Sequence, residues 1–384
     1  MNKLLNLIIM TECVNSNGEE NFIVLDGGLG TELTRAGFKI DDDPLWSTRT
    51  LIENSEAVKA VHKSFLESGA DIVITGTYQL SLETLHQHCD FDENKALDVI
   101  YSSVKIAQEA CLEVKSNNSE YKRRLLVAGS VGPYGACQHD WSEYSGNYVD
   151  NMTIKQLMDW HRPRVKALLE AGVDILALET IPAQKEAEAL IQLLKEFPTA
   201  KAWLCFSCKD ERHTCHGELF SEVVTKIVCQ SAQIVAVGVN CSPPQFVKSI
   251  QGKVDLPLIV YPNGFDGGKF VWDDDEHQVL SGHVMERMLW DAAEGHSQDK
   301  KDSRKYWVTI NRFDFSLGLY QGPSGFTLIA PCKSQGRGVR RIADWTRITS
   351  LVSVNGLFQP IGNKNKSEIY NGVLFCFLSV VKPK

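Results

Sequence analysis

Short apolar runs that alternate with amphipathic stretches constrain this chain most, from residue 22 onward. Residues 55–68, for example, place Val58, Val61 and Phe65 on one helical face, and similar stretches occupy residues 154–171 and 185–196. Alternation of strands and helices predicts a parallel sheet. The eight apolar runs that we interpret as strands are 22–25, 71–75, 125–130, 174–178, 202–207, 234–239, 258–261 and 326–330.

Eight strand–helix units favour a closed barrel over an open, doubly wound sheet. The glycine-rich stretch at 27–33 lacks the third glycine of a dinucleotide-binding fingerprint. We therefore predict an α/β fold, a (β/α)8 TIM barrel with a divergent C-terminal segment. The predicted organisation is an N-terminal extension at 1–19, a barrel at 20–347 with an irregular insertion at 266–325, and a tail at 348–384. An insertion of that length is either functional or disordered.

Composition narrows the class of protein. The 384 residues suit one barrel with insertions, and the net charge of -8 argues against a nucleic-acid-binding protein. The 11 cysteines are odd in number and lack a framework spacing, which indicates a reducing compartment. The apolar run at 4–10 is too short to span a membrane and has no small-residue cleavage site. We predict a cytoplasmic protein with small-molecule partners, no nucleic acid and no membrane, of unknown oligomeric state.

Four reactive side chains follow predicted strands directly. Asp26 follows the first strand, Glu179 the fourth, Cys241 the sixth and Cys332 the eighth. The carboxyl ends of barrel strands form the active-site face. Two carboxylates there can bind an amino group, and two cysteines can bind a soft metal. Each residue alone is more often a helix cap, an ion pair or a core cysteine, but four at one edge favour a site.

The most informative of these segments is Gly-Val-Asn-Cys-Ser-Pro-Pro at 238–244, which stops a buried strand abruptly. If Cys241 is ionised, its thiolate can serve as a metal ligand or a nucleophile. If it is a buried neutral thiol, it only caps the strand. A second group contains Cys205, Cys208, His213, Cys215 and His216. Its first two cysteines lie three apart on a predicted strand and so point to opposite faces, which favours a structural role.

Several motifs together resemble the homocysteine S-methyltransferase family, and most closely its members that use S-methylmethionine or S-adenosylmethionine. They are Asp-Gly-Gly-Leu-Gly-Thr-Glu-Leu at 26–33, Gly-Ala-Asp-Ile-Val at 69–73, Thr-Gly-Thr-Tyr-Gln at 75–79, Val-Gly-Pro-Tyr-Gly at 131–135, Leu-Glu-Thr-Ile-Pro at 178–182 and the 238–244 segment. The resemblance covers residues 20–266 and resumes at 326–345. It implies a zinc-bearing barrel in methionine biosynthesis, which transfers a methyl group from a sulfonium donor to the zinc-bound thiolate of homocysteine.

The resemblance also implies roles for single residues. Cys241 and Cys332 are the expected Zn²⁺ ligands, and no catalytic residue is expected beyond the metal site. Asp26 and Glu179 match the positions that hold the homocysteine amino group. The expected substrate-binding residues are Asp26, Gly27, Gly28, Thr77, Glu179 and Asn240.

One segment departs from the family pattern. The family carries adjacent cysteines in a Gly-Gly-Cys-Cys run, whereas this chain reads Leu-Ile-Ala-Pro-Cys-Lys at 328–333. Cys332 therefore remains, Pro331 replaces the other cysteine, and the third ligand is unidentified. We predict weak zinc binding and low activity. The alternative is a homocysteine- or methionine-binding barrel that has lost part of its zinc site, and a more remote one is a zinc-free barrel lyase or aldolase.

Overall fold

The computed structural model describes residues 23–40, 43–117, 124–243, 246 and 256–262, together with the backbone of four strands at 306–309, 318–322, 325–330 and 340–342. The chain divides into two compact units, Met1–Asn311 and Arg312–Lys384. The first unit contains a parallel sheet, and the second contains a three-stranded antiparallel sheet. The described residues do not test the predicted boundaries at 19/20 and 347/348.

The first unit is an α/β structure built on a curled parallel sheet. Its first seven strands are β1 (Ile23–Leu25), β2 (Ile72–Ile74), β3 (Leu126–Val131), β4 (Ile175–Ile181), β5 (Ala202–Phe206), β6 (Ile234–Asn240) and β7 (Leu258–Tyr261). Each strand pairs in parallel with the next one along the chain. β8 (Tyr306–Thr309) pairs with both β7 and β1, so the strand order returns on itself. The predicted parallel sheet and its first seven strands are confirmed.

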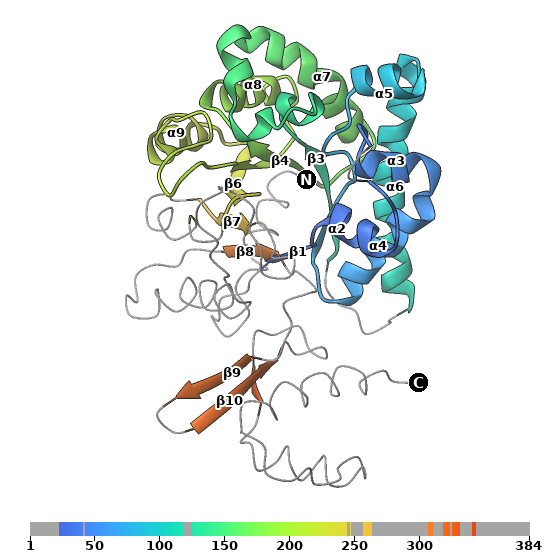
Figure 1. Ribbon diagram of the computed structural model, residues 1–384, viewed down its shortest axis with the longest axis vertical. Coiled ribbons are helices and arrows are strands. Elements are labelled where there is room, and N and C mark those ends of the chain that lie inside the picture. The colour runs from blue at the N-terminus through green and yellow to red at the C-terminus, as the bar shows by residue number, and fades with distance from the viewer. Residues whose placement is uncertain are drawn as a thin grey trace. The chain divides into compact units, whose positions relative to one another are not determined.

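Helices lie in an arc on the outside of these strands (Figure 1). They are α2 (Leu29–Arg35), α3 (Ser47–Glu53), α4 (Ser55–Glu67), α5 (Leu82–Cys89), α6 (Glu93–Asn117), α7 (Ile154–Glu170), α8 (Gln184–Leu194) and α9 (Phe220–Lys226). Short 3-10 helices are η1 (Tyr134–Cys137), η2 (Ser142–Tyr144), η3 (Asn147–Asn151) and η4 (Val228–Gln230). The three helices predicted from amphipathic patterns are α4, α7 and α8. In the described residues, no helix is both long and apolar enough to cross a membrane.

Local sequence explains where several helices begin. The side chain of Asn54 accepts a hydrogen bond from the backbone N–H of Ala57 at the start of α4. At α7, the Thr153 and Gln156 side chains each bond to the other's backbone N–H in a capping box. These caps satisfy donors that an isolated helix end leaves open. Helix starts are therefore encoded within a few residues of each helix.

Alternate strand residues form two separate apolar clusters. One packs under the helices and includes Leu178, Val239 and Val260. The other lies on the opposite face of the sheet. Its fully or partly buried members are Ile23, Leu25, Ile72, Ile74, Leu126, Ala128, Ile175, Ala177, Trp203, Cys205, Val235, Ala236, Ile259 and Tyr261. Two residues beyond Ala128, Ala177 and Gly238 on that same face come Ser130, Glu179 and Asn240. The face is thus apolar along its length and polar at the carboxyl ends of the strands.

The predicted eighth barrel strand is wrong. Residues 326–330 belong to β10 (Gly325–Ala330), which pairs antiparallel with β9 (Gly318–Gly322) and β11 (Arg340–Ile342). The place between β7 and β1 is taken by β8, which lies in the stretch predicted to be irregular. An apolar run predicts a strand but not its partners. The glycines that flank Pro323 and Ser324 are a hairpin signal that the strand pattern alone overlooked.

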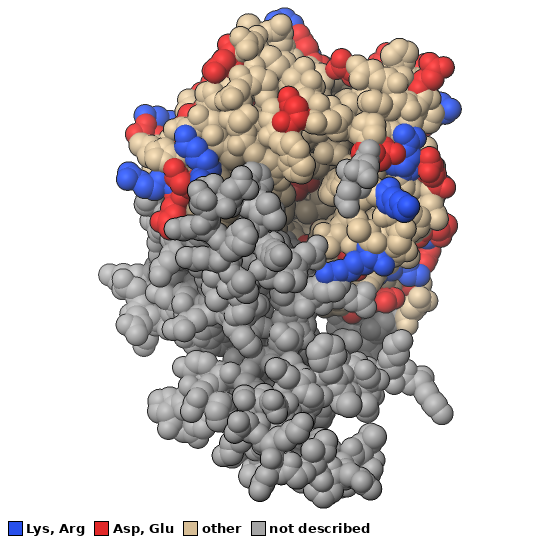
Figure 2. Space-filling model, in the orientation of Figure 1, with Lys and Arg blue, Asp and Glu red and all other residues tan. Residues whose placement is uncertain are grey.

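Charged side chains of both signs are present on the described surface in one view of the molecule. On the face in Figure 2, Lys and Arg residues are interspersed with Asp and Glu residues. The described residues on this face therefore form no extended patch of one sign.

Candidate active site at the carboxyl ends of the strands

Asp26 lies at the carboxyl end of β1 and is 4% exposed. Its Oδ2 accepts a hydrogen bond of 2.8 Å from the backbone N–H of Ile74, at the end of the neighbouring strand. Its Oδ1 is buried and has no hydrogen-bond partner among the described residues. Burial raises the pKa of Asp26 well above its ordinary value, and the nearby charge of Glu179 raises it further. The carboxyl group is held firmly through one oxygen and open at the other.

Glu179 lies near the end of β4 and is 7% exposed. It accepts hydrogen bonds from the hydroxyls of Ser130 and Tyr261. Burial raises the pKa of Glu179 to about 7, and the two hydroxyls oppose that rise. Among the described residues, the groups that shift the pKa values of Asp26 and Glu179 include no Lys, Arg or His. Two interacting buried carboxyls without a basic partner form a site for a cation.

Asn240 ties β6 to β4. Its Oδ1 accepts a 2.7 Å hydrogen bond from the backbone N–H of Thr180, and its Nδ2 donates to Thr180 Oγ1 at 2.7 Å and to Cys241 Sγ at 3.3 Å. Thr180 and Cys241 have φ angles of 59° and 45°, in the left-handed region. Such backbone costs about 1–3 kcal/mol for a non-glycine residue and persists where surrounding bonds fix it. Asn240 supplies those bonds and thereby aims the cysteine.

The thiol of Cys241 stands next to these groups. Burial raises its pKa to about 11, the charge of Glu179 adds to the rise, and hydrogen bonds from Thr180 and Asn240 oppose it. Tyr144 from η2 also makes a side-chain hydrogen bond with Cys241. The group is therefore a neutral thiol at neutral pH, and a nearby cation would be needed to ionise it.

A metal at this site must draw on residues beyond the described ranges. The described residues contain no group of three or more His, Cys, Asp or Glu side chains that could hold a metal ion. Cys241 fits as one thiol ligand, but zinc takes at least three protein ligands. Cys332 lies outside the described residues. The argument that it faces Cys241 relied on residues 326–330 as a barrel strand, so that argument no longer holds.

The remaining predicted substrate residues lie at the same strand ends. Gly27 follows Asp26, and Gly28 precedes α2 as its N-cap. Thr77 is 2% exposed, and its hydroxyl donates to the carbonyl of Ser130 at 2.8 Å. In this structure that hydroxyl joins the loop after β2 to β3, and its role toward a substrate stays a prediction.

Sequence reasoning missed four side chains at the site. Ser130 and Tyr261 could have been found, because they continue the apolar face of their strands by steps of two residues. Glu143 and Tyr144 carried no periodic signal, since they lie in η2 between β3 and α7. Glu143 is 7% exposed, and its backbone carbonyl accepts a 2.9 Å hydrogen bond from Ser207 Oγ. Burial raises the pKa of the Glu143 carboxyl to about 7.

A buried ionic network fixes the loops that border the site. Arg164 of α7 donates to the carbonyl oxygens of Leu80 and Gly132, in the loops after β2 and β3. Its guanidinium also lies 2.7 Å from His161 Nδ1, and His161 Nε2 lies 2.9 Å from Glu186 Oε1. Because these side chains are at most 3% exposed, the network holds both loops rigidly against α7 and α8.

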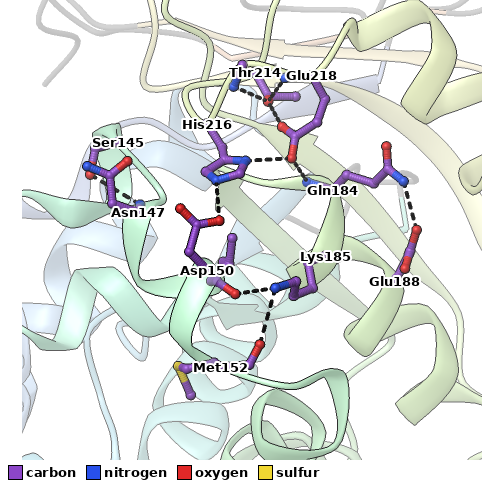
Figure 3. Close-up of polar contacts among 12 residues, drawn as sticks. Ser145, Asn147, Asp150, Met152, Gln184, Lys185, Glu188, Thr214, His216 and Glu218 are labelled. Carbon is purple, nitrogen blue, oxygen red and sulfur yellow. Dashed lines mark hydrogen bonds and ion pairs between the residues drawn. The ribbon is translucent and has the colours of Figure 1, made fainter.

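The second cysteine and histidine group makes structural contacts. Figure 3 shows His216 between two carboxylates, with Nε2 3.2 Å from Asp150 Oδ1 and Nδ1 2.8 Å from Glu218 Oε1. Lys185 of α8 donates to the carbonyl of Met152 at 3.4 Å in the same view. His213 instead bonds to Asp210 at 2.9 Å. These contacts fasten the loop after β5 to η3 and to the start of α8. Cys205 belongs to the apolar cluster on the far side of the sheet from the helices.

Known proteins with the same sequence pattern carry out methyl transfer. The family model described as homocysteine S-methyltransferase matches residues 23–297. The homocysteine S-methyltransferase YbgG of Bacillus subtilis (strain 168) is 42% identical over 247 residues, which cover 63% of this chain and 77% of that protein. The betaine-homocysteine S-methyltransferase of Drosophila melanogaster is 40% identical over 258 residues, which cover 63% of this chain and 78% of that protein.

A solved structure agrees in fold. The metallated form of the homocysteine methyltransferase MmuM from Escherichia coli matches with a TM-score of 0.66 and 32% identity, over 80% of this chain and 95% of that one. The residues matched by the family model include the strands whose carboxyl ends hold Asp26, Glu179 and Cys241. The chain is a methyltransferase and belongs to the homocysteine S-methyltransferase family.

Proposed function

We propose that this protein transfers a methyl group from a sulfonium donor, S-methylmethionine or S-adenosylmethionine, to the thiol of homocysteine, forming methionine. Membership of the family supports methyl transfer to homocysteine. The observation that carries the proposal for this chain is the pair of buried carboxyls, Asp26 and Glu179, beside the thiol of Cys241. An amino acid with a cationic amino group and a sulfur at its other end complements that arrangement.

Asp26 and Glu179 bind the acceptor's ammonium group in this proposal. Asp26 Oδ1 is the buried oxygen without a described partner, and an ammonium N–H would supply the missing bond. The cation would also relieve the repulsion that raises the pKa of Asp26. Neither carboxyl acts as an acid or base, because alkylation of an ionised thiol requires no proton transfer.

We also propose Zn²⁺ at the site, with Cys241 and Cys332 as ligands. Family membership and the metallated MmuM structure support a metal. When bound, zinc would lower the pKa of the acceptor thiol so that a thiolate exists near neutral pH. The chain's own residues position the reactants. Asn240 orients Cys241, and the two carboxyls anchor the amino end of homocysteine.

The transfer itself balances without a further reagent. An electron pair on the homocysteine sulfur forms the new S–CH3 bond. The C–S bond of the donor breaks, and its electron pair returns to the donor sulfur, which becomes a neutral thioether. The positive charge of the donor and the negative charge of the acceptor both disappear in this step.

The proposed fold is a complete (β/α)8 barrel. Two observations support a closed barrel. β8 pairs with β7 and with β1, and the match to MmuM covers 80% of the chain. We place the protein in the cytoplasm, because the buried cysteines Cys111, Cys137, Cys205, Cys208 and Cys215 are free thiols. Buried unpaired thiols are typical of a reducing compartment.

A labelled-methyl assay tests the function. The purified full chain is incubated with homocysteine and a methyl-deuterated donor, and methionine is analysed by mass spectrometry. S-methylmethionine or S-adenosylmethionine should yield labelled methionine, and Cys241→Ser should abolish it. Absence of labelled methionine with both donors, under conditions where the chain is zinc-loaded, would refute the proposal.

A second candidate is a homocysteine- or methionine-binding protein with little activity. The Pro331-Cys332 sequence favours it, because the family pattern has a cysteine at both positions. Tight methionine binding without stoichiometric zinc or turnover would support this candidate over the enzyme.

A further inference from the structure

A third buried carboxyl borders the same thiol. Glu143 lies in η2, in the segment between β3 and α7. Its backbone is fixed by the hydrogen bond from Ser207, and a Cβ atom on Gly135 would lie only 2.7 Å from the Glu143 nitrogen. The η2 turn is thus packed tightly against η1, and the Glu143 side chain is directed by a rigid backbone.

The carboxyl of Glu143 has an unused oxygen. Its Oε2 is buried and has no hydrogen-bond partner among the described residues. Its charge acts on the thiol of Cys241 and on the hydroxyls of Tyr78 and Tyr144. The next residue, Tyr144, bonds directly to Cys241. Glu143 therefore lies near the thiol of Cys241, whereas the proposed function assigns Asp26 and Glu179 to the amino group of the acceptor.

We propose that Glu143 binds the positively charged sulfur of the methyl donor and so selects sulfonium donors over their neutral thioether products. This inference rests on the proposed function and adds a residue that recognises the donor. Within the part of the chain that the structure describes, the groups acting on Glu143 include Asp140 but no Lys, Arg or His. A buried acidic oxygen without a basic partner is stabilised by a cationic ligand. The sulfonium carries the positive charge that must lie beside the acceptor sulfur during transfer.

The chemistry predicts a particular kinetic signature. The sulfonium charge is complete in the bound donor and decreases as the methyl group moves to the thiolate. A carboxylate near it therefore stabilises the bound donor at least as much as the transition state. Removing the charge of Glu143 should raise KM for the donor without lowering kcat.

Direct binding measurements isolate the effect of the sulfonium charge on affinity. S-methylmethionine and methionine share the same ammonium and carboxylate and differ by one methyl group and the sulfonium charge. The full chain and its Glu143→Gln variant are titrated with each ligand by calorimetry. The variant should lose about tenfold or more in S-methylmethionine affinity, as expected for one partner of a buried charge pair, and keep its methionine affinity.

Two further variants separate charge from folding. Glu143→Asp keeps the charge and should retain part of the S-methylmethionine affinity. Asp98→Asn removes a charge from an exposed position on α6, and it should bind both ligands as the unmodified chain does.

The proposal fails if Glu143→Gln binds S-methylmethionine normally, if it loses methionine affinity equally, or if the unmodified chain does not bind the sulfonium ligand. These titrations do not depend on turnover. A chain that shows the Glu143 contrast but makes no methionine would refute the proposed function and leave this inference standing.

Discussion

At the scale of single residues, a functional site is indicated by a buried carboxyl oxygen that lacks a hydrogen-bond partner among the described residues. Asp71 and Asp174, at the amino ends of β2 and β4, accept 2.9 Å hydrogen bonds from the N–H groups of Val24 and Val127. Asp26 makes the same kind of bond to a neighbouring strand at the carboxyl ends. Asp174 also has Arg124 at 3.4 Å, whereas Asp26 keeps a buried oxygen without a described partner.

The pKa of Glu179 predicts how ligand binding depends on pH. Because burial raises it to about 7, the carboxyl is largely protonated below that value and ionised above it. Ammonium binding requires the ionised form. Methionine affinity should therefore rise between pH 6 and 8, and Glu179→Gln should bind weakly with a flatter profile. Calorimetric titration with methionine between pH 6 and 8 measures this dependence. If the affinity of Glu179→Gln changed with pH as that of the unmodified chain does, the role of Glu179 would be contradicted.

At the scale of helices and strands, the sequence was informative where signals are local. Short apolar runs located β1 to β7, and amphipathic stretches located α4, α7 and α8. The conformations of two kinds of loop could not be predicted from the sequence: the loop that carries Glu143, and the loops whose carbonyl groups accept hydrogen bonds from Arg164. Contacts between distant segments of the chain fix them. Likewise, Asp26, Glu179 and Cys241 could be placed at strand ends, but their burial and Asn240's bonds to Thr180 required the structure.

The glycine at 238 shows how one motif residue sets strand packing. A Cβ atom there would lie 1.7 Å from the carbonyl oxygen of Ile259 on β7, a backbone atom that cannot move alone. Gly238→Ala should therefore destabilise the protein by more than about 3 kcal/mol or prevent folding. In Gly76→Ala, the added atom would meet only the Leu29 side chain at 3.0 Å, so that variant is the control. Equal urea-unfolding midpoints for both variants would show that the β6–β7 contact is not so restrictive.

At the scale of the whole molecule, the zinc prediction depends on the segment around Cys332. Residues 326–330 pair in an antiparallel sheet of the second unit, and the described residues supply one thiol ligand. A family pattern could name Cys332 as a ligand, but no local rule could assign its strand to a sheet, because strand partners are chosen over long sequence distances.

Metal analysis of the full chain tests this part of the proposal. We expect weak zinc binding, its loss in Cys241→Ser and in Cys332→Ser, and a gain in Pro331→Cys, because a third thiolate completes the usual ligand number. Zinc content by mass spectrometry after dialysis against a chelator measures each case. Tight zinc binding that survives Cys332→Ser would place the other ligands elsewhere in the chain.

The most direct test concerns the claim that Asp26 binds the acceptor's amino group. Homocysteine affinity is measured by calorimetry for the full chain, for Asp26→Asn and for Asp174→Asn. Both changes remove a carboxylate that accepts a bond from a neighbouring strand, but at opposite ends of the sheet. Asp26→Asn should weaken binding by about tenfold or more, as for loss of a charged hydrogen bond, and Asp174→Asn should leave it unchanged. Unchanged affinity in Asp26→Asn, or an equal loss in both variants, would contradict the assignment.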